Sequence, residues 1–157
     1  MLSYSPLYIA MKHIRFSEQI TVGAPQEAVF NFSQDYGRRL EWDTFLKRAE
    51  LINGATRAGL GVKAYCVSKG GYKMETEYVS YQAPKVTAVK ISKGPYMFKN
   101  FVGSWNFRKL SEQETEVLFT YAFSLRFPFN FIGFYIKWDL AKNVRERLKD
   151  LKRCVEA

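Results

Sequence analysis

The sequence predicts an α+β fold in which a curved antiparallel sheet wraps around one long C-terminal helix. A strand-like segment and two short helical segments follow one another up to residue 42. Six strand-like runs separated by turn residues come next, with no helical pattern among them, as in an antiparallel meander. Over residues 130–155 the apolar period becomes that of a helix. A sheet that wraps a helix in this way leaves a space between them, which suits a small apolar molecule.

The first strand is expected over residues 14–22, which alternate imperfectly and end in β-branched residues. A Gly-Ala-Pro sequence ends this strand, and Pro25 suits the first turn of a helix, where no backbone N–H is needed. That helix is short and buries Phe30 on its inward side. Asp35 is expected to cap a second short helix, which ends at Trp42 in the core.

The middle of the chain contains six further strand-like runs. Turn sequences such as Asn53-Gly54 and Gly94-Pro95 separate them. Consecutive runs joined by such turns pair antiparallel. The expected strands are residues 44–51, 61–68, 72–81, 85–92, 96–109 and 115–126.

Aromatic residues alternate along the last two strands and so share one face, which we expect to be concave and to line the cavity. Gly103 in this row permits sharp curvature or leaves room for a ligand. Trp105 suits a ligand wall and a packed core equally well. Glu75 and Glu77 alternate with the apolar set of their strand and are expected to be solvated. The strand residues expected to contact a ligand are Tyr65, Met74, Thr76, Tyr78, Trp105, Phe107, Phe119, Tyr121 and Phe123.

The C-terminal helix carries an apolar stripe at steps of three and four residues, and this stripe is expected to form the other wall of the cavity. Seven Lys/Arg residues against three Asp/Glu residues between Lys137 and Arg153 are assigned to its outer face. The three tyrosines in the ligand set are the expected polar positions, because a phenol offers one hydrogen bond within an apolar wall. The helix residues expected to contact a ligand are Ile136, Leu140 and Val144.

The segment 127–136 contains more aromatic side chains than one helix face can bury. Our favoured interpretation is that these side chains roof the mouth of the cavity. The alternative is an exposed apolar patch beside the basic residues Lys137, Lys142 and Arg145, which would contact an anionic membrane surface weakly.

We expect residues 12–157 to form one domain, because 157 residues suffice for a single core. Residues 1–11 are expected to be a peripheral extension. They lack a basic start and Pro6 interrupts their apolar run, unlike a secretory signal, and Met11 is an alternative start. The aromatic content of 17% suits a bulky core and an aromatic-lined cavity equally.

The net charge of +9 is scattered, without a run of five Lys/Arg or a nucleic-acid motif, so we expect a solvated basic surface and no specific nucleic-acid binding. Two cysteines and one histidine provide neither a zinc cluster nor a disulfide framework, so we expect no metal and no cofactor. This cysteine usage is typical of a reducing cytoplasm.

A set of structural residues extends over nearly the whole chain. It comprises Ile20-x-Val22-x-Ala24-Pro25-x-Glu27-x-Val29-Phe30, then Asp35, Arg39 and Trp42, the corner Tyr81-x-x-Pro84, Trp105 and Thr115. With these residues the chain resembles the START/Bet v 1-like (SRPBCC) superfamily over about residues 12 to 155. Within it the likeness is greatest to bacterial polyketide cyclase/dehydrase-type ligand-binding proteins.

The resemblance implies a helix-grip fold, with a seven-stranded antiparallel sheet around the C-terminal helix. It also implies binding of a small hydrophobic ligand between sheet and helix. The oxygenase members need two histidines and a carboxylate for iron, and the single His13 excludes that activity. Two alternatives remain open: a cyclase or dehydratase acting on an aromatic or polyketide-like substrate, for which no catalytic motif is present, and a module that binds a protein or membrane surface.

Overall fold

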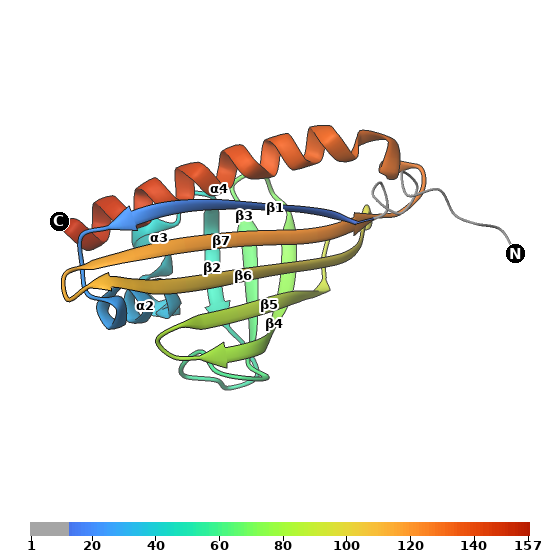
Figure 1. Ribbon diagram of the computed structural model, residues 1–157. Helices are drawn as coiled ribbons and strands as arrows, with labels where there is room; N and C mark the ends of the chain where they lie inside the picture. The colour runs from blue at the N-terminus through green and yellow to red at the C-terminus, as the bar shows by residue number, and fades with distance from the viewer. Residues whose placement is uncertain (1–12) are drawn as a thin grey trace, which may run out of the picture.

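A computed structural model describes residues 13–157, which form a seven-stranded antiparallel sheet and a long C-terminal helix (Figure 1). This confirms the predicted helix-grip fold. The strand order is β1-β7-β6-β5-β4-β3-β2, so the first strand pairs with the last and the other strands follow as a meander. The expected extension over residues 1–11 and the alternative start at Met11 lie outside the described residues.

All the predicted strands are present, and each strand end lies within two residues of its predicted position. The strands are β1 (Ile14–Val22), β2 (Leu46–Leu51), β3 (Lys63–Ser68), β4 (Lys73–Gln82), β5 (Val86–Lys93), β6 (Phe98–Ser111) and β7 (Glu114–Leu125). The helical elements are α2 (Gln26–Gln34), the 3-10 turn η1 (Tyr36–Arg38), α3 (Arg39–Trp42), the 3-10 turn η2 (Phe129–Ile132) and α4 (Gly133–Glu156).

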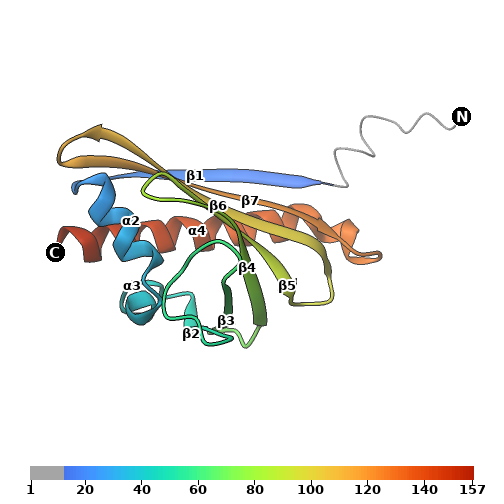
Figure 2. The same ribbon diagram turned by 90° about the horizontal axis from the view of Figure 1, so that it is seen from below.

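Helix α4 runs along β1 and β7 for most of the length of the sheet, while β2 to β5 curve away from it (Figure 1). The short helices α2 and α3 lie together at one end of the molecule, seen from below in Figure 2. Helix α2 contacts β6 and β7, and α3 contacts α4. The short helices therefore close the end of the sheet where α4 finishes.

The core lies between β1, β6, β7 and the inner stripe of α4, and α2 and α3 complete it. Trp42 is fully buried, as predicted, and its ring meets that of Trp105 edge to face at 6.0 Å. Pro25 precedes α2 directly, and the Thr115 hydroxyl donates to the backbone oxygen of Ala24 at 2.8 Å. Such buried hydrogen bonds hold the helix entry against β7.

The predicted cap at Asp35 is confirmed. Its carboxylate accepts a hydrogen bond of 2.9 Å from the backbone N–H of Gly37 and so begins η1. This turn redirects the chain between α2 and α3. As a result, two residues of functional interest, Tyr36 and Arg39, lie at the concave side of the sheet.

Candidate functional site

A small, partly open cavity of about 70 Å³ lies between the concave side of the sheet, α3 and one side chain of α4. Its apolar walls come from β2, the residue before it, and β4 to β7. Half of its polar residues come from η1, α3 and α4, and the other half from β3, β4 and β7. The apolar wall residues are Phe45, Leu46, Met74, Val89, Ile91, Phe101, Trp105 and Phe119. The polar lining residues are Tyr36, Arg39, Cys66, Thr76, Tyr121 and Arg147.

The structure brings five of the twelve predicted ligand residues together at this cavity. They are Met74, Thr76, Trp105, Phe119 and Tyr121. They come from β4, β6 and β7, where the alternation of side chains assigned them to the concave face. Whether they contact a ligand stays a prediction.

Five other predicted residues pack in the core instead of lining the cavity. Helix α4 lies over β1 and β7, so its apolar stripe fills the space against those strands and leaves little of it for a cavity wall. These residues are Phe107, Phe123, Ile136, Leu140 and Val144.

Tyr65 lies on the outer face of the sheet, because Cys66 beside it points inward and successive side chains alternate. The guanidinium of Arg48 lies 5.1 Å from its ring. Tyr78 is buried, but its hydroxyl turns toward α2 and donates to the side chain of Gln34 at 2.8 Å. Tyr65 and Tyr78, which were predicted to contact a ligand, therefore do not line this cavity.

Glu75 and Glu77 lie on the outer face, as predicted. Glu75 pairs with Lys63 and Lys93, and Glu77 pairs with Lys90. The two carboxylates are therefore paired with lysines on the outer surface of the sheet.

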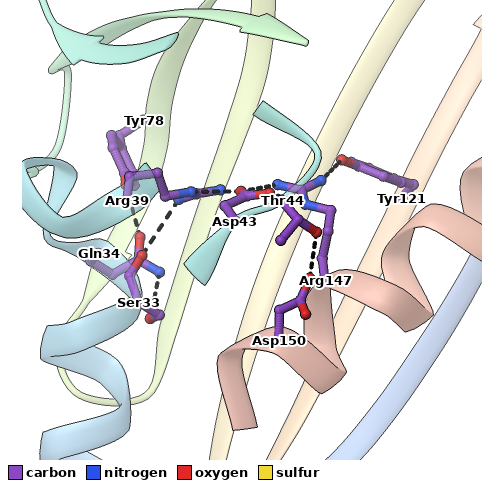
Figure 3. A network of polar contacts seen from close by, with 9 residues as sticks. All are labelled: Ser33, Gln34, Arg39, Asp43, Thr44, Tyr78, Tyr121, Arg147 and Asp150. Carbon is purple, nitrogen blue, oxygen red and sulfur yellow. Dashed lines mark hydrogen bonds and ion pairs between the residues drawn. The ribbon is translucent and has the colours of Figure 1, made fainter. Parts of the chain in front are cut away.

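A buried ion-pair network stands behind the polar side of the cavity (Figure 3). The carboxylate of Asp43 accepts two hydrogen bonds from Arg147, from Nε at 3.0 Å and from Nη2 at 2.8 Å. It also accepts one from Nε of Arg39 at 2.8 Å. Two guanidinium groups thus share one carboxylate, and the network carries one excess positive charge.

The electrostatics of this network keep all three groups charged. Burial alone would raise the pKa of Asp43, but Arg147 and Arg39 outweigh it and hold that pKa below its usual value. Burial would likewise lower the pKa of Arg147, yet Asp43 keeps it above its usual value. The network is therefore a fixed source of positive charge beside the cavity.

Arg147 extends the network to the cavity surface by donating from Nη1 to the hydroxyl oxygen of Tyr121 at 2.9 Å. On the other side, Arg39 donates to the backbone oxygen of Ser33, whose hydroxyl accepts from Gln34. Gln34 in turn accepts from Tyr78. The polar groups of α2, α3, β4, β7 and α4 are thus linked across the inside of the sheet.

These groups can donate hydrogen bonds and attract negative charge, but they are poor at exchanging protons near neutral pH. The carboxylate of Asp43 is occupied by its two arginines. Burial raises the pKa of Tyr36, which stays a phenol, and burial raises the pKa of the Cys66 thiol. Within residues 13–157, no three Cys, His, Asp or Glu side chains gather as they would around a metal ion.

No role was predicted for Asp43, Arg39 was named only among the structural residues of the family resemblance, and Arg147 was expected on the outer face of α4. One signal was available for each. Arg147 stands three residues after Val144 and four before Leu151, which is a position on the apolar stripe. Arg39 and Asp43 have the i, i+4 spacing of an ion pair within one helical turn.

The aromatic segment 127–136 does not roof the cavity, contrary to the favoured interpretation. Phe127 and Phe134 are 77% and 79% exposed. The reason is that η2 and the first turns of α4 lie beyond the cavity, at the end of the molecule opposite α2 and α3 (Figure 1).

The family model described as polyketide cyclase/dehydrase and lipid transport matches residues 13–156. The comparison with curated proteins gives no match. No helix among residues 13–157 is long and apolar enough to span a membrane.

Solved structures with the same fold include an aromatase/cyclase from Streptomyces sp. R1128, with 15% identity, a TM-score of 0.77 and coverage of 92% of this chain and 94% of that one. A protein from Thermus thermophilus has 19% identity, a TM-score of 0.76 and coverage of 90% and 97%. Norcoclaurine synthase from Thalictrum flavum has 8% identity, a TM-score of 0.72 and coverage of 91% and 94%. At these identities the likeness concerns the fold.

Proposed function

Since the chain belongs to the polyketide cyclase/dehydrase and lipid transport family, we propose that its cavity binds a small hydrophobic molecule carrying an acceptor oxygen. The observation that carries this proposal is the pairing of apolar walls with the Arg147–Tyr121 hydrogen bond at one side. Pockets of this kind use apolar walls for affinity and a few polar groups for orientation.

Tyr121 is the group that would meet the ligand's oxygen. Its hydroxyl oxygen accepts from Arg147, which leaves the phenolic hydrogen to be donated to a ligand. The excess positive charge of the Asp43 network strengthens a hydrogen bond to a carbonyl, carboxylate or phenolate oxygen. A hydrocarbon of the same shape could not accept this hydrogen bond and should bind more weakly.

The size of the cavity limits the ligand. A volume of about 70 Å³ is well below the roughly 300–1,000 Å³ of drug-sized pockets, and below the roughly 150 Å³ of an apolar cavity that holds benzene. A ligand with a single ring is therefore the upper limit, and it enters only if the open side of the cavity widens. Met74, Ile91 and Phe101 are among the lining residues that are only partly buried. Movement of the flexible Met74 side chain is the easiest way to admit a larger molecule.

A second hollow, of about 410 Å³, opens at the surface and shares Phe45 and Arg147 with the cavity. The guanidinium of Arg147 lies 5.2 Å from the ring of Phe45. These two side chains therefore form the wall between hollow and cavity. The Arg147 side chain is held in place by Asp43. The Phe45 side chain is therefore the one expected to rotate and admit a ligand.

A cyclase or dehydratase acting on an aromatic or polyketide-like substrate is the second candidate. The same Tyr121 hydroxyl would polarise a ketone, and Arg147 would stabilise the negative charge that develops on its oxygen. Such a reaction also needs a proton acceptor, and the Asp43 carboxylate is already held by both arginines. The geometry therefore favours binding over catalysis.

The binding experiment uses acetophenone and ethylbenzene, which have nearly the same shape but differ in one carbonyl oxygen. Acetophenone should raise the melting temperature in a saturable way, because a ligand that binds the folded state stabilises it by mass action. One hydrogen bond predicts about a two- to tenfold preference over ethylbenzene. Benzoate tests the anionic case.

The variant Tyr121→Phe removes the hydroxyl and should abolish the preference for acetophenone while leaving ethylbenzene binding unchanged. The control is Tyr65→Phe, on the outer face of the sheet. Equal binding of both compounds by the wild type would remove the acceptor-oxygen proposal. Absence of saturable binding for all three compounds would remove the ligand-binding proposal at this size.

A further inference from the structure

The η2 turn and the start of α4 are apolar on the outer face as well as on the inner face. Phe134, Tyr135 and Trp138 lie on one side of α4, at steps of one and three residues, and Phe131 of η2 comes three residues before them. Gly133 and Ile136 face the core on the other side. A helix that is apolar all round is normally covered on both sides, so the outer face indicates a covering surface.

These side chains form an aromatic patch, defined as Phe127, Phe131, Ile132, Phe134, Tyr135 and Trp138. Each is between 47% and 79% exposed. Beyond Trp138 the outer face of the same helix becomes charged, beginning with Asp139 and Lys142. This change near the start of the helix shows that the apolar outer face is confined to the corner between β7 and α4.

Cations border the aromatic patch. Arg15 and Lys137 line one hollow together with Phe131 and Phe134, and the ammonium of Lys142 lies 5.8 Å from the Trp138 ring. One carboxylate, Asp139, is nearby, so three cations and one anion leave a local charge of +2. The whole chain carries +9. The patch therefore suits a surface that is both apolar and negatively charged.

The geometry points to docking of this corner on an anionic phospholipid membrane, which we infer to be the occupant of the aromatic patch. Trp, Tyr and Phe side chains insert at the boundary between headgroups and acyl chains, while Lys and Arg contact anionic headgroups. A second copy of the chain fits less well, because both patches carry net charge of the same sign.

This inference is independent of the proposed ligand binding. The patch residues do not line the cavity, and the corner lies at the end of the molecule opposite α2 and α3 (Figure 1). Membrane binding can therefore fail while ligand binding holds, and the reverse.

Tryptophan fluorescence gives a direct test. Of the three tryptophans, Trp42 and Trp105 are buried, whereas Trp138 is 58% exposed. Vesicles of phosphatidylcholine mixed with phosphatidylglycerol should shift the emission to shorter wavelength as Trp138 leaves water. Vesicles of phosphatidylcholine alone should produce a much smaller shift. Added salt should reverse the shift in part, because it screens the cations.

Two pairs of variants locate the contact. Phe131→Ser combined with Phe134→Ser should abolish co-sedimentation with the anionic vesicles, whereas Leu60→Ser, which changes an equally exposed apolar residue elsewhere, should not. Lys137→Gln combined with Lys142→Gln should weaken binding about thirtyfold, since each cation contributes about 1 kcal/mol at an anionic surface. Lys149→Gln, on the charged part of α4, is its control.

Three results would overturn the inference. The first is absence of binding to anionic vesicles by the folded wild type. The second is binding that survives the phenylalanine substitutions and is lost when the chain begins at Met11, which would assign the contact to residues 1–10. The third is a concentration-dependent dimer without lipid in which the Trp138 emission is already shifted, which would make a second copy the occupant.

Discussion

The ring of Tyr121 lies against the backbone of Gly103, so close that a β-carbon at position 103 would stand 2.9 Å from Cε1 of the tyrosine. The two residues are cross-strand partners in β6 and β7. Gly103 thus gives the ring the place from which its hydroxyl meets Arg147. The sequence suggested that Gly103 allows sharp curvature or leaves space for a ligand. In the structure, the space beside Gly103 is occupied by the ring of Tyr121.

Gly103→Ala should therefore displace Tyr121 and break its hydrogen bond to Arg147. We expect a loss of about 1–3 kcal/mol in the free energy of unfolding, the usual cost of overpacking, and a loss of acetophenone binding. Gly59→Ala is the matched control, since its nearest neighbouring atom would be 3.9 Å away. Chemical denaturation measures the first effect and thermal shift the second. Unchanged stability and binding would show that Tyr121 is free to move.

Asp43→Asn should cost about 3–5 kcal/mol, because it leaves two buried guanidinium groups without their anion. Glu41→Gln is the control: Glu41 forms an exposed pair with Arg38, and its loss should cost less than about 1 kcal/mol. Urea denaturation of both variants at neutral pH provides the comparison. A cost below about 1 kcal/mol for both would contradict the role given to the network.

The stability difference between the wild type and Asp43→Asn should depend on pH in a defined direction. The pKa of Asp43 is lowered in the folded state, so its stabilising contribution is complete above its unfolded pKa, about 3.9, and is lost as the pH falls through the folded pKa. The difference should therefore be constant near neutral pH and shrink below about pH 4. Urea denaturation of both proteins over this pH range measures the difference. A difference that already shrinks above about pH 5 would mean that a group other than Asp43 titrates.

Val89→Phe and Val144→Phe make the same change at two different places. Val89 is half-buried at the cavity, and the new ring should fill the cavity, preserve stability and abolish acetophenone binding. Val144 is 2% exposed in the core under α4, and overpacking there should cost about 1–3 kcal/mol. If the Val89 variant binds acetophenone as well as the wild type does, the ligand binds elsewhere.

A chain that begins at Met11 should be nearly as stable as the full chain, because terminal residues rarely contribute to a core. The comparison of melting temperatures tests this. A large decrease would show that residues 1–10 dock on the domain.

The strands, the helix entry at Pro25 and the cap at Asp35 could be predicted from sequence because each depends on neighbouring residues. The cavity could be predicted only in part, because it depends on where α4 crosses the sheet. Alternation along β4, β6 and β7 correctly placed Met74, Trp105 and Phe119 on the concave face, because the alternation does not depend on where α4 lies. The stripe of α4 was assigned to a cavity wall, but the helix lies over β1 and β7 and its stripe is filled core.

The ion-pair network was beyond sequence reasoning for a different reason. Asp43 and Arg147 are 104 residues apart, and only the folded chain brings them together. Charged residues in short helices and on a basic C-terminal helix are usually solvated, so the general rule assigned Arg147 to the surface. The exception arises where α3 contacts α4 and a carboxylate meets the guanidinium in the interior.

The pairing of β1 with β7 determines when the domain can become complete. The hydroxyls of Ser17 and Thr120, 103 residues apart, meet at 2.7 Å across these two strands. Along the whole of β1 the hydrogen-bonding partner is β7, a strand that is synthesised after β2 to β6. During translation, the backbone groups of β1 therefore stay unpaired while the β2–β6 meander is made. The closing of this pair joins the first and last strands of the sheet, which makes it a late and slow step in folding.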